Sequence, residues 1–67
     1  MAKIIANGNQ VEVNQSCRLS EWLTQIGWKP TQVVIELNGE VIPRSQVKDV
    51  ILNDGDNLEV VFPVAGG

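Results

Sequence analysis

The stretch with the most unusual chemistry is Phe62-Pro63-Val64-Ala65-Gly66-Gly67, which finishes on two residues without side chains. A terminal carboxylate is a poor electrophile, but conversion to an acyl-adenylate makes it open to attack. An enzyme that does this must thread the end of another protein through a narrow channel, where glycine removes the bulk of a Cβ atom. We therefore expect residues 63–67 to form a flexible reactive tail, with Gly67 as the activated group and with channel contacts from Val64, Ala65 and Gly66. The alternative is a frayed terminus without a function.

Other candidates for chemistry are weak. The chain contains one cysteine and no histidine, so Cys-His or Ser-His catalysis within it is excluded. We expect Cys17 to be a small, half-buried hydrophobic residue. Asp54 and Asp56 flank Gly55, but further calcium ligands are missing and a turn is the better interpretation. The sequence predicts no metal site, no bound cofactor and no enzyme activity of its own.

Length and charge narrow the class of protein. With 67 residues, 43% of them hydrophobic, the chain forms one small globular domain. No apolar run approaches the ~20 residues of a membrane span, and a signal peptide pattern is missing. The net charge is −3, which argues against binding to nucleic acid. We expect a cytoplasmic protein without contact to a membrane.

Two Asn-Gly pairs organise the strands. Asn7-Gly8 predicts an opening hairpin, with a loop that Asn9 and Gln10 can lengthen, and Asn38-Gly39 predicts a second hairpin that Pro43 ends. A short helical turn is expected over 45–48, a turn over 53–56 and a last strand over 57–62. We expect the apolar segment 50–52 to pack under the sheet.

One helix is predicted between the hairpins. Leu19, Trp22, Leu23 and Ile26 are spaced as one helical face, and Gly27 is placed to end the helix. We expect Trp28 to pack back on this helix. The expected core consists of Ile4, Val11, Val13, Leu19, Leu23, Ile26, Ile35, Leu37, Leu58 and Val60, together with Trp22.

This order of elements predicts an α+β fold in two layers, because one helix can cover only one face of a sheet. The last strand can lie parallel to the first, between the inner strands of the two hairpins. That arrangement is the β-grasp, or ubiquitin-like, fold: a mixed sheet of four to five strands with one main helix across one face, here over residues 1–62. The uncovered face is expected to carry an apolar patch for a partner, formed by Ile5, Val34 and Val61.

The sequence resembles the ThiS family, the sulphur carriers of thiamine biosynthesis, over its whole length. The resemblance is carried by segments 37–44 (LNGEVIPR), 52–56 (LNDGD) and 64–67 (VAGG). It implies that an adenylating, E1-like enzyme uses ATP and magnesium to activate the Gly67 carboxylate. A sulphur donor such as a cysteine desulphurase then supplies sulphur, and the resulting thiocarboxylate delivers it to thiazole synthase.

Other functions are compatible with the same chemistry. The ending Phe62 to Gly67 is similar to that of the small subunit of molybdopterin synthase, and many thiamine carriers have a glycine where Ala65 stands. A ubiquitin-like modifier would use the same adenylation but form an isopeptide bond. A plain adaptor would bind through its sheet and leave the tail inert.

Overall fold

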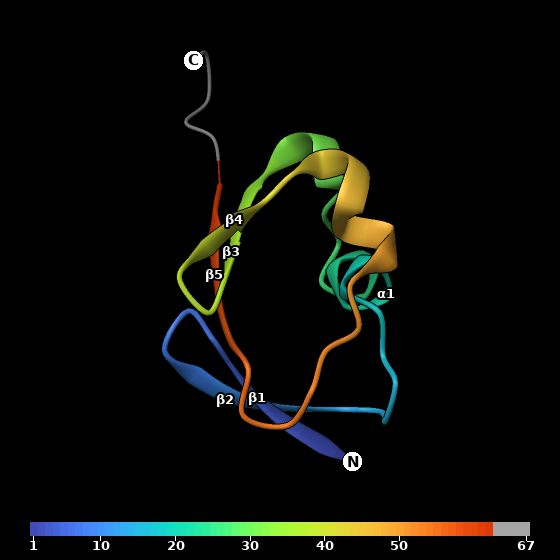
Figure 1. Cartoon of the computed structure of the whole chain (residues 1–67), viewed down its shortest axis with the longest axis vertical. Helices are drawn as coiled ribbons and strands as arrows, with labels where there is room; N and C mark the ends of the chain where they lie inside the picture. The colour runs from blue at the N-terminus through green and yellow to red at the C-terminus, as the bar shows by residue number, and fades with distance from the viewer. Residues whose placement is uncertain (63–67) are drawn as a thin grey trace.

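The computed structural model describes residues 1–62. Its strands and helices follow the predicted order closely (Figure 1). The strands are β1 (Ala2–Ala6), β2 (Asn9–Val13), β3 (Val34–Leu37), β4 (Glu40–Ile42) and β5 (Asn57–Val61). The α-helix is α1 (Leu19–Gln25), and the two 3-10 segments are η1 (Pro30–Gln32) and η2 (Arg44–Asp49).

The five strands form one sheet in the order β2-β1-β5-β3-β4. Each hairpin is antiparallel, β5 runs antiparallel to β3, and β1 and β5 are parallel. α1 and η2 lie together on one side of this sheet (Figure 1). The predicted β-grasp fold is therefore confirmed, including the place of the last strand between the inner strands of the two hairpins.

Both hairpins close with two-residue turns. Asn7 and Gly8 have φ values of 50° and 83°, and Asn38 and Gly39 have φ values of 53° and 87°. Positive φ at both central positions is what a type I′ turn requires, and its twist matches that of the flanking strands. In the first hairpin Ala6 pairs with Asn9, so the longer loop that the sequence allowed does not form.

The asparagine side chains of these turns also hold β5 from both sides. The Asn7 side chain accepts a hydrogen bond from the Val60 N–H at 2.7 Å and donates one to the Val60 carbonyl at 3.3 Å. The Asn38 side chain accepts one from the Asn57 N–H at 2.9 Å and donates one to Asp56 Oδ1 at 3.1 Å. Each turn thus closes its own hairpin and fixes the central strand.

Helix α1 is short and ends earlier than its apolar spacing suggests. It starts after Arg18, whose backbone N–H donates to Glu21 Oε1 at 3.3 Å. Gly27 has a φ of 89°, as a residue just past a helix end often does. The prediction that Ile26 belongs to the core was wrong, because the helix ends at Gln25 and the Ile26 side chain is 42% exposed.

The core lies between the sheet and the layer of α1 and η2. Most of the predicted core residues are buried, whereas Val11 and Leu37 are only partly buried at the margin of the core. The buried predictions are Ile4, Val13, Leu19, Trp22, Leu23, Ile35, Leu58 and Val60. Sequence reasoning did not include Ala2, Ala6 or Val47, which are buried as well.

The segment before β5 packs against the core through Leu52 and, in part, Val50. Leu52 is 1% exposed, but Ile51 is 45% exposed and forms an isolated bridge with Arg18. The expectation that all of 50–52 packs under the sheet was therefore too broad: Leu52 is buried and the half-buried Val50 packs against the core, whereas Ile51 is exposed. The predicted tail, residues 63–67, lies outside the described residues, so its separation from the domain stays a prediction.

Candidate functional site

The described chain ends next to the predicted reactive residues. Gly67 and the three residues expected to bind with it, Val64, Ala65 and Gly66, lie outside the described residues. β5 ends at Val61, and Phe62 is the last described residue before them. The surroundings of this end of β5 are therefore the described part of the candidate site.

Phe62 contacts the region just beyond α1. Its ring centroid lies 4.6 Å from that of Trp28, with an interplanar angle of 42°. The Trp28 backbone N–H donates to the Leu23 carbonyl at 3.1 Å, and its half-buried side chain packs against the core, which confirms that Trp28 packs back on the domain. Aromatic pairs at such distances are favourable, so this contact stabilises the position of Phe62 directly after β5.

The three residues of the predicted partner patch are exposed, but they do not all meet. Val34 and Val61 are 52% and 55% exposed and lie directly opposite each other on β3 and β5. Ile5 is 43% exposed, but it pairs with Asn57 at the other end of β5. The structure thus brings Val34 and Val61 together near the candidate tail and places Ile5 apart from them.

Sequence reasoning missed Val41 on the same uncovered face. It is 61% exposed and pairs with Glu36, which pairs on its other side with Glu59. The alternation in β4 was a usable signal, because Val41 is out of phase with the inward-facing Ile42. An apolar face that contains two facing carboxylates is unusual, since like charges directly opposite each other destabilise a sheet.

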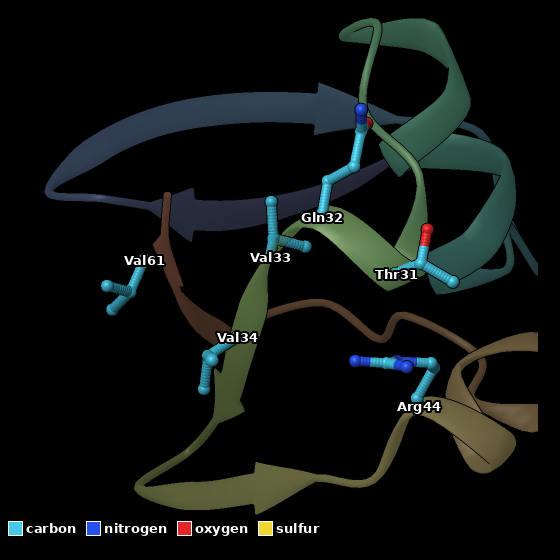
Figure 2. Close-up of a pocket in the computed structure, with 6 residues that line it drawn as sticks. All are labelled: Thr31, Gln32, Val33, Val34, Arg44 and Val61. Atoms are coloured by element: carbon cyan, nitrogen blue, oxygen red, sulfur yellow. The ribbon is translucent and has the colours of Figure 1, made fainter. Parts of the chain in front are cut away.

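A cavity of about 250 Å³ opens beside this valine pair. Its walls come from β3, the end of β5, η1 and the start of η2 (Figure 2). The lining residues are Thr31, Gln32, Val33, Val34, Arg44 and Val61. In Figure 2 the Arg44 guanidinium points towards β3, whereas the amide of Gln32 points away from it. Arg44 is the last residue of the segment 37–44, but sequence reasoning gave it no role at a site.

The remaining polar candidates have structural roles. Cys17 is buried, and this burial, with the nearby charge of Glu21, raises the pKa of its thiol against the opposing hydrogen bond from the Trp22 backbone. The thiol therefore stays protonated at neutral pH, so it is a poor nucleophile. Asp54 accepts a hydrogen bond from the Lys3 N–H at 2.8 Å, and Asp56 accepts one from the Asn53 N–H at 2.7 Å, which confirms the predicted turn.

Residues 1–62 contain neither a metal-binding cluster nor a membrane-spanning helix. In this part of the chain, side chains that could bind a metal do not gather in groups of three or more. The helices there are also too short or too polar to cross a membrane.

The family is decided by a match along almost the whole sequence. The model of the ThiS family matches residues 2–67. The chain belongs to the ThiS family. The matched range of this ThiS-family chain includes the ending Ala65-Gly66-Gly67.

A solved structure agrees with this assignment. The crystal structure of the thiamine biosynthesis protein ThiS from Geobacter metallireducens has a TM-score of 0.80 to this ThiS-family chain and 29% sequence identity, over 97% of this chain and 99% of that one. The β-grasp arrangement and its chain length are thus common to both.

Two curated relatives are considerably longer. A thiazole synthase from Paramagnetospirillum magneticum is 34% identical over 65 residues, and one from Magnetococcus marinus is 32% identical over 65 residues. Each match covers 97% of this ThiS-family chain but only 20% of the relative. A protein of similar length, the uncharacterised protein ycf40 from Pyropia yezoensis, is 31% identical over 91% of this chain and 86% of its own.

Proposed function

We propose that this protein is a sulphur carrier of thiamine biosynthesis, which supplies the sulphur of the thiazole ring. The observation that carries the proposal is the ThiS-family match over residues 2–67, which includes the Gly66-Gly67 ending. The protein acts as a co-substrate rather than as an enzyme. Support for this comes from Cys17, the one cysteine of the chain, which is buried with a raised thiol pKa. Catalytic groups then belong to the partners.

The proposed chemistry uses the carboxylate of Gly67. An activating, E1-like enzyme transfers AMP from ATP, with magnesium, to this carboxylate and releases pyrophosphate. The terminal sulphur of a persulphide, made by a donor such as a cysteine desulphurase, attacks the acyl carbon and AMP leaves. A thiol then reduces the acyl disulphide and leaves a thiocarboxylate at Gly67. Thiazole synthase accepts the sulphur of this group.

Docking is assigned to the uncovered face of the sheet. Val34 and Val61 form an exposed apolar pair at the end of β5, where a bound partner also meets residues 63–67. Ile5 lies farther along the same face and takes part only if the partner covers the full length of β5. Thiazole synthase as a partner is supported by the two longer relatives that carry this name. These steps belong in the cytoplasm, where ATP is available.

Deletion of Gly67 tests the proposed chemistry. The variant should fold normally but give no ATP–pyrophosphate exchange with the activating enzyme and no thiocarboxylate, because the reacting carbon no longer reaches the nucleotide. Normal exchange by this variant would rule out Gly67 as the activated residue.

A second substitution tests the narrow channel. Gly66→Ala adds one methyl group and should lower exchange sharply while the free energy of unfolding changes by less than about 0.5 kcal/mol. A thermal melt of both variants is the control for folding. Exchange at the wild-type rate by Gly66→Ala would contradict a channel without room for a Cβ atom.

A second candidate function has one observation in its favour. The ending Phe62-Pro63-Val64-Ala65-Gly66-Gly67 has alanine before its two glycines, as in the carrier of molybdopterin synthesis. Loss of the gene distinguishes the two functions: we expect a growth requirement for thiazole or thiamine. A defect in the molybdenum cofactor would instead favour the second candidate, and covalent conjugates to other proteins would favour a modifier.

A further inference from the structure

The cavity beside Val34 and Val61 is lined by one positively charged side chain, that of Arg44, among uncharged residues. Arg44 is the first residue of η2 and directly follows Pro43, which ends β4. Its guanidinium points into the cavity towards β3 (Figure 2). Three of the other lining residues are valines, and the rest are the uncharged Thr31 and Gln32. Among residues 1–62, the cavity wall therefore contains no carboxylate that could pair with Arg44.

Arg18, the other arginine of the chain, has a structural role. Arg18 donates a hydrogen bond from its guanidinium to the Lys48 carbonyl at 3.0 Å, which links the start of α1 to the end of η2. Arg44 has a different position, at the mouth of a cavity and next to an exposed apolar pair. The chain has 8 acidic and 5 basic side chains. Acidic residues are thus frequent in the sequence, but none among residues 1–62 lines the cavity.

The size of the cavity limits what it can hold. At about 250 Å³ it lies below the ~300–1,000 Å³ typical of sites for small molecules and cofactors. The side chain of an aspartate or glutamate fits this space, with its methylene groups against the valines. Its planar carboxylate matches the fork of donors on a guanidinium.

We propose that the Arg44 cavity receives an aspartate or glutamate side chain of the protein that docks over Val34 and Val61. Because both valines also line the cavity, a partner that covers them closes the mouth of the cavity at the same time. Closure removes water from the guanidinium and its carboxylate, and a charged pair interacts more strongly in this less polar setting. The valines supply apolar contact area, and Arg44 fixes the orientation of the partner.

This inference rests on the proposed function for the identity of the partners, which are the activating enzyme and thiazole synthase. In the free protein, the Arg44 guanidinium does not need a carboxylate partner, because Arg44 is exposed to water. A small anion in solution gains little from one exposed guanidinium, since it must give up its own hydration. The carboxylate is therefore assigned to a partner and not to a free metabolite.

The test measures dissociation constants of full-length variants by calorimetry, with each partner purified from the same source organism. Arg44→Glu should weaken binding to at least one partner by about tenfold or more, the range of a lost charged hydrogen bond. Arg44→Lys should keep part of the affinity, because it keeps the charge but loses the fork of donors. Lys48→Glu is the matched control: it makes the same charge change on the same segment η2, away from the cavity, and should change the dissociation constant by less than about twofold.

The outcomes separate this inference from the proposed function. If Arg44→Glu binds both partners within about twofold of the wild type, or no more weakly than Lys48→Glu, the Arg44 inference is overturned, even where Gly67 deletion abolishes exchange. Loss of binding by Arg44→Glu with unchanged thermal stability supports it. Titration with inorganic phosphate and with acetate covers free anions, and saturable binding of either one at Arg44 would reassign the cavity to a small anion and overturn the inference.

Discussion

Val60 and Val61 are neighbours of the same residue type on the strand at the centre of the sheet, but they have opposite environments. Val60 is 5% exposed and belongs to the core, whereas Val61 is 55% exposed on the uncovered face. The two faces differ in the same way along the sheet. The inner face is closed by α1 and η2, and the outer face leaves Val34, Val41 and Val61 in water beside two facing glutamates.

The difference between the two faces separates the residues that stabilise the fold from the residues that are exposed to a partner. Apolar area on the inner face is removed from water when the chain folds, so it contributes to the free energy of folding. Apolar area on the outer face contributes only when another molecule covers it. Residue type alone does not distinguish the two, and the first two comparisons below take one position from each environment.

The largest contrast is expected between Val60→Asp and Val61→Asp. Val60→Asp places a charge in the core without a partner and should lower the free energy of unfolding by about 3 kcal/mol or more, enough to unfold a small domain. Val61→Asp should change it by less than about 0.5 kcal/mol but weaken partner binding. Chemical denaturation measures both. If Val61→Asp unfolds the protein, the outer face is part of the core after all.

A smaller contrast is expected within and just beyond α1. Leu23 is fully buried and Ile26 is 42% exposed. Leu23→Ala should cost about 2–5 kcal/mol through the cavity it leaves, whereas Ile26→Ala should stay within about 0.5 kcal/mol. Equal losses in urea denaturation would show that Ile26 packs against the core in solution.

The two turn asparagines provide the third comparison. Asn7→Gly and Asn38→Gly both keep a residue that tolerates positive φ, so they mainly remove the side-chain hydrogen bonds to β5. The bonds of Asn7 are partly buried and those of Asn38 are exposed. We expect a loss of about 1–3 kcal/mol for Asn7→Gly and below ~1 kcal/mol for Asn38→Gly, because water can replace exposed bonds. Thermal melts check the order, and a larger loss at Asn38 would contradict it.

The smallest effect is expected for charges on the outer face. Glu59 faces Glu36, whereas Glu12 on β2 faces Lys3. Glu59→Gln should raise the free energy of unfolding by about 0.2–1 kcal/mol, and Glu12→Gln should lower it slightly. Both effects should shrink in high salt, since exposed charges are screened. The same sign for both variants at low salt would mean that these cross-strand pairs do not interact.

Local signals made most of the fold predictable from the sequence. The Asn-Gly pairs, Gly27 and Pro43 act within a few residues, so the hairpins and the ends of their elements could be predicted. The limits appear where distant segments meet. Ile26 has the correct helical spacing, but the position of the helix end decides its burial.

The candidate site could be predicted only in part. Val34 and Val61 followed from alternation along each strand, but their direct pairing depends on the register between β3 and β5. The cavity of Arg44 needs three stretches that are separate in the sequence, residues 31–34, Arg44 and Val61, so no local pattern indicates it. The hydrogen bonds from Asn7 and Asn38 to β5 are hidden for the same reason.

The parallel pairing of β1 and β5 has a consequence for joining this domain to other polypeptides. Ile5 is level with Asn57, so Ala2 lies three residues before this level and Val61 four residues beyond it. These seven residues, at about 3.3 Å each, separate Ala2 from Val61 by roughly 23 Å along the sheet. A second domain genetically fused ahead of Ala2 therefore emerges at the far end of the sheet, and Val34, Val61 and Arg44 stay open to a partner.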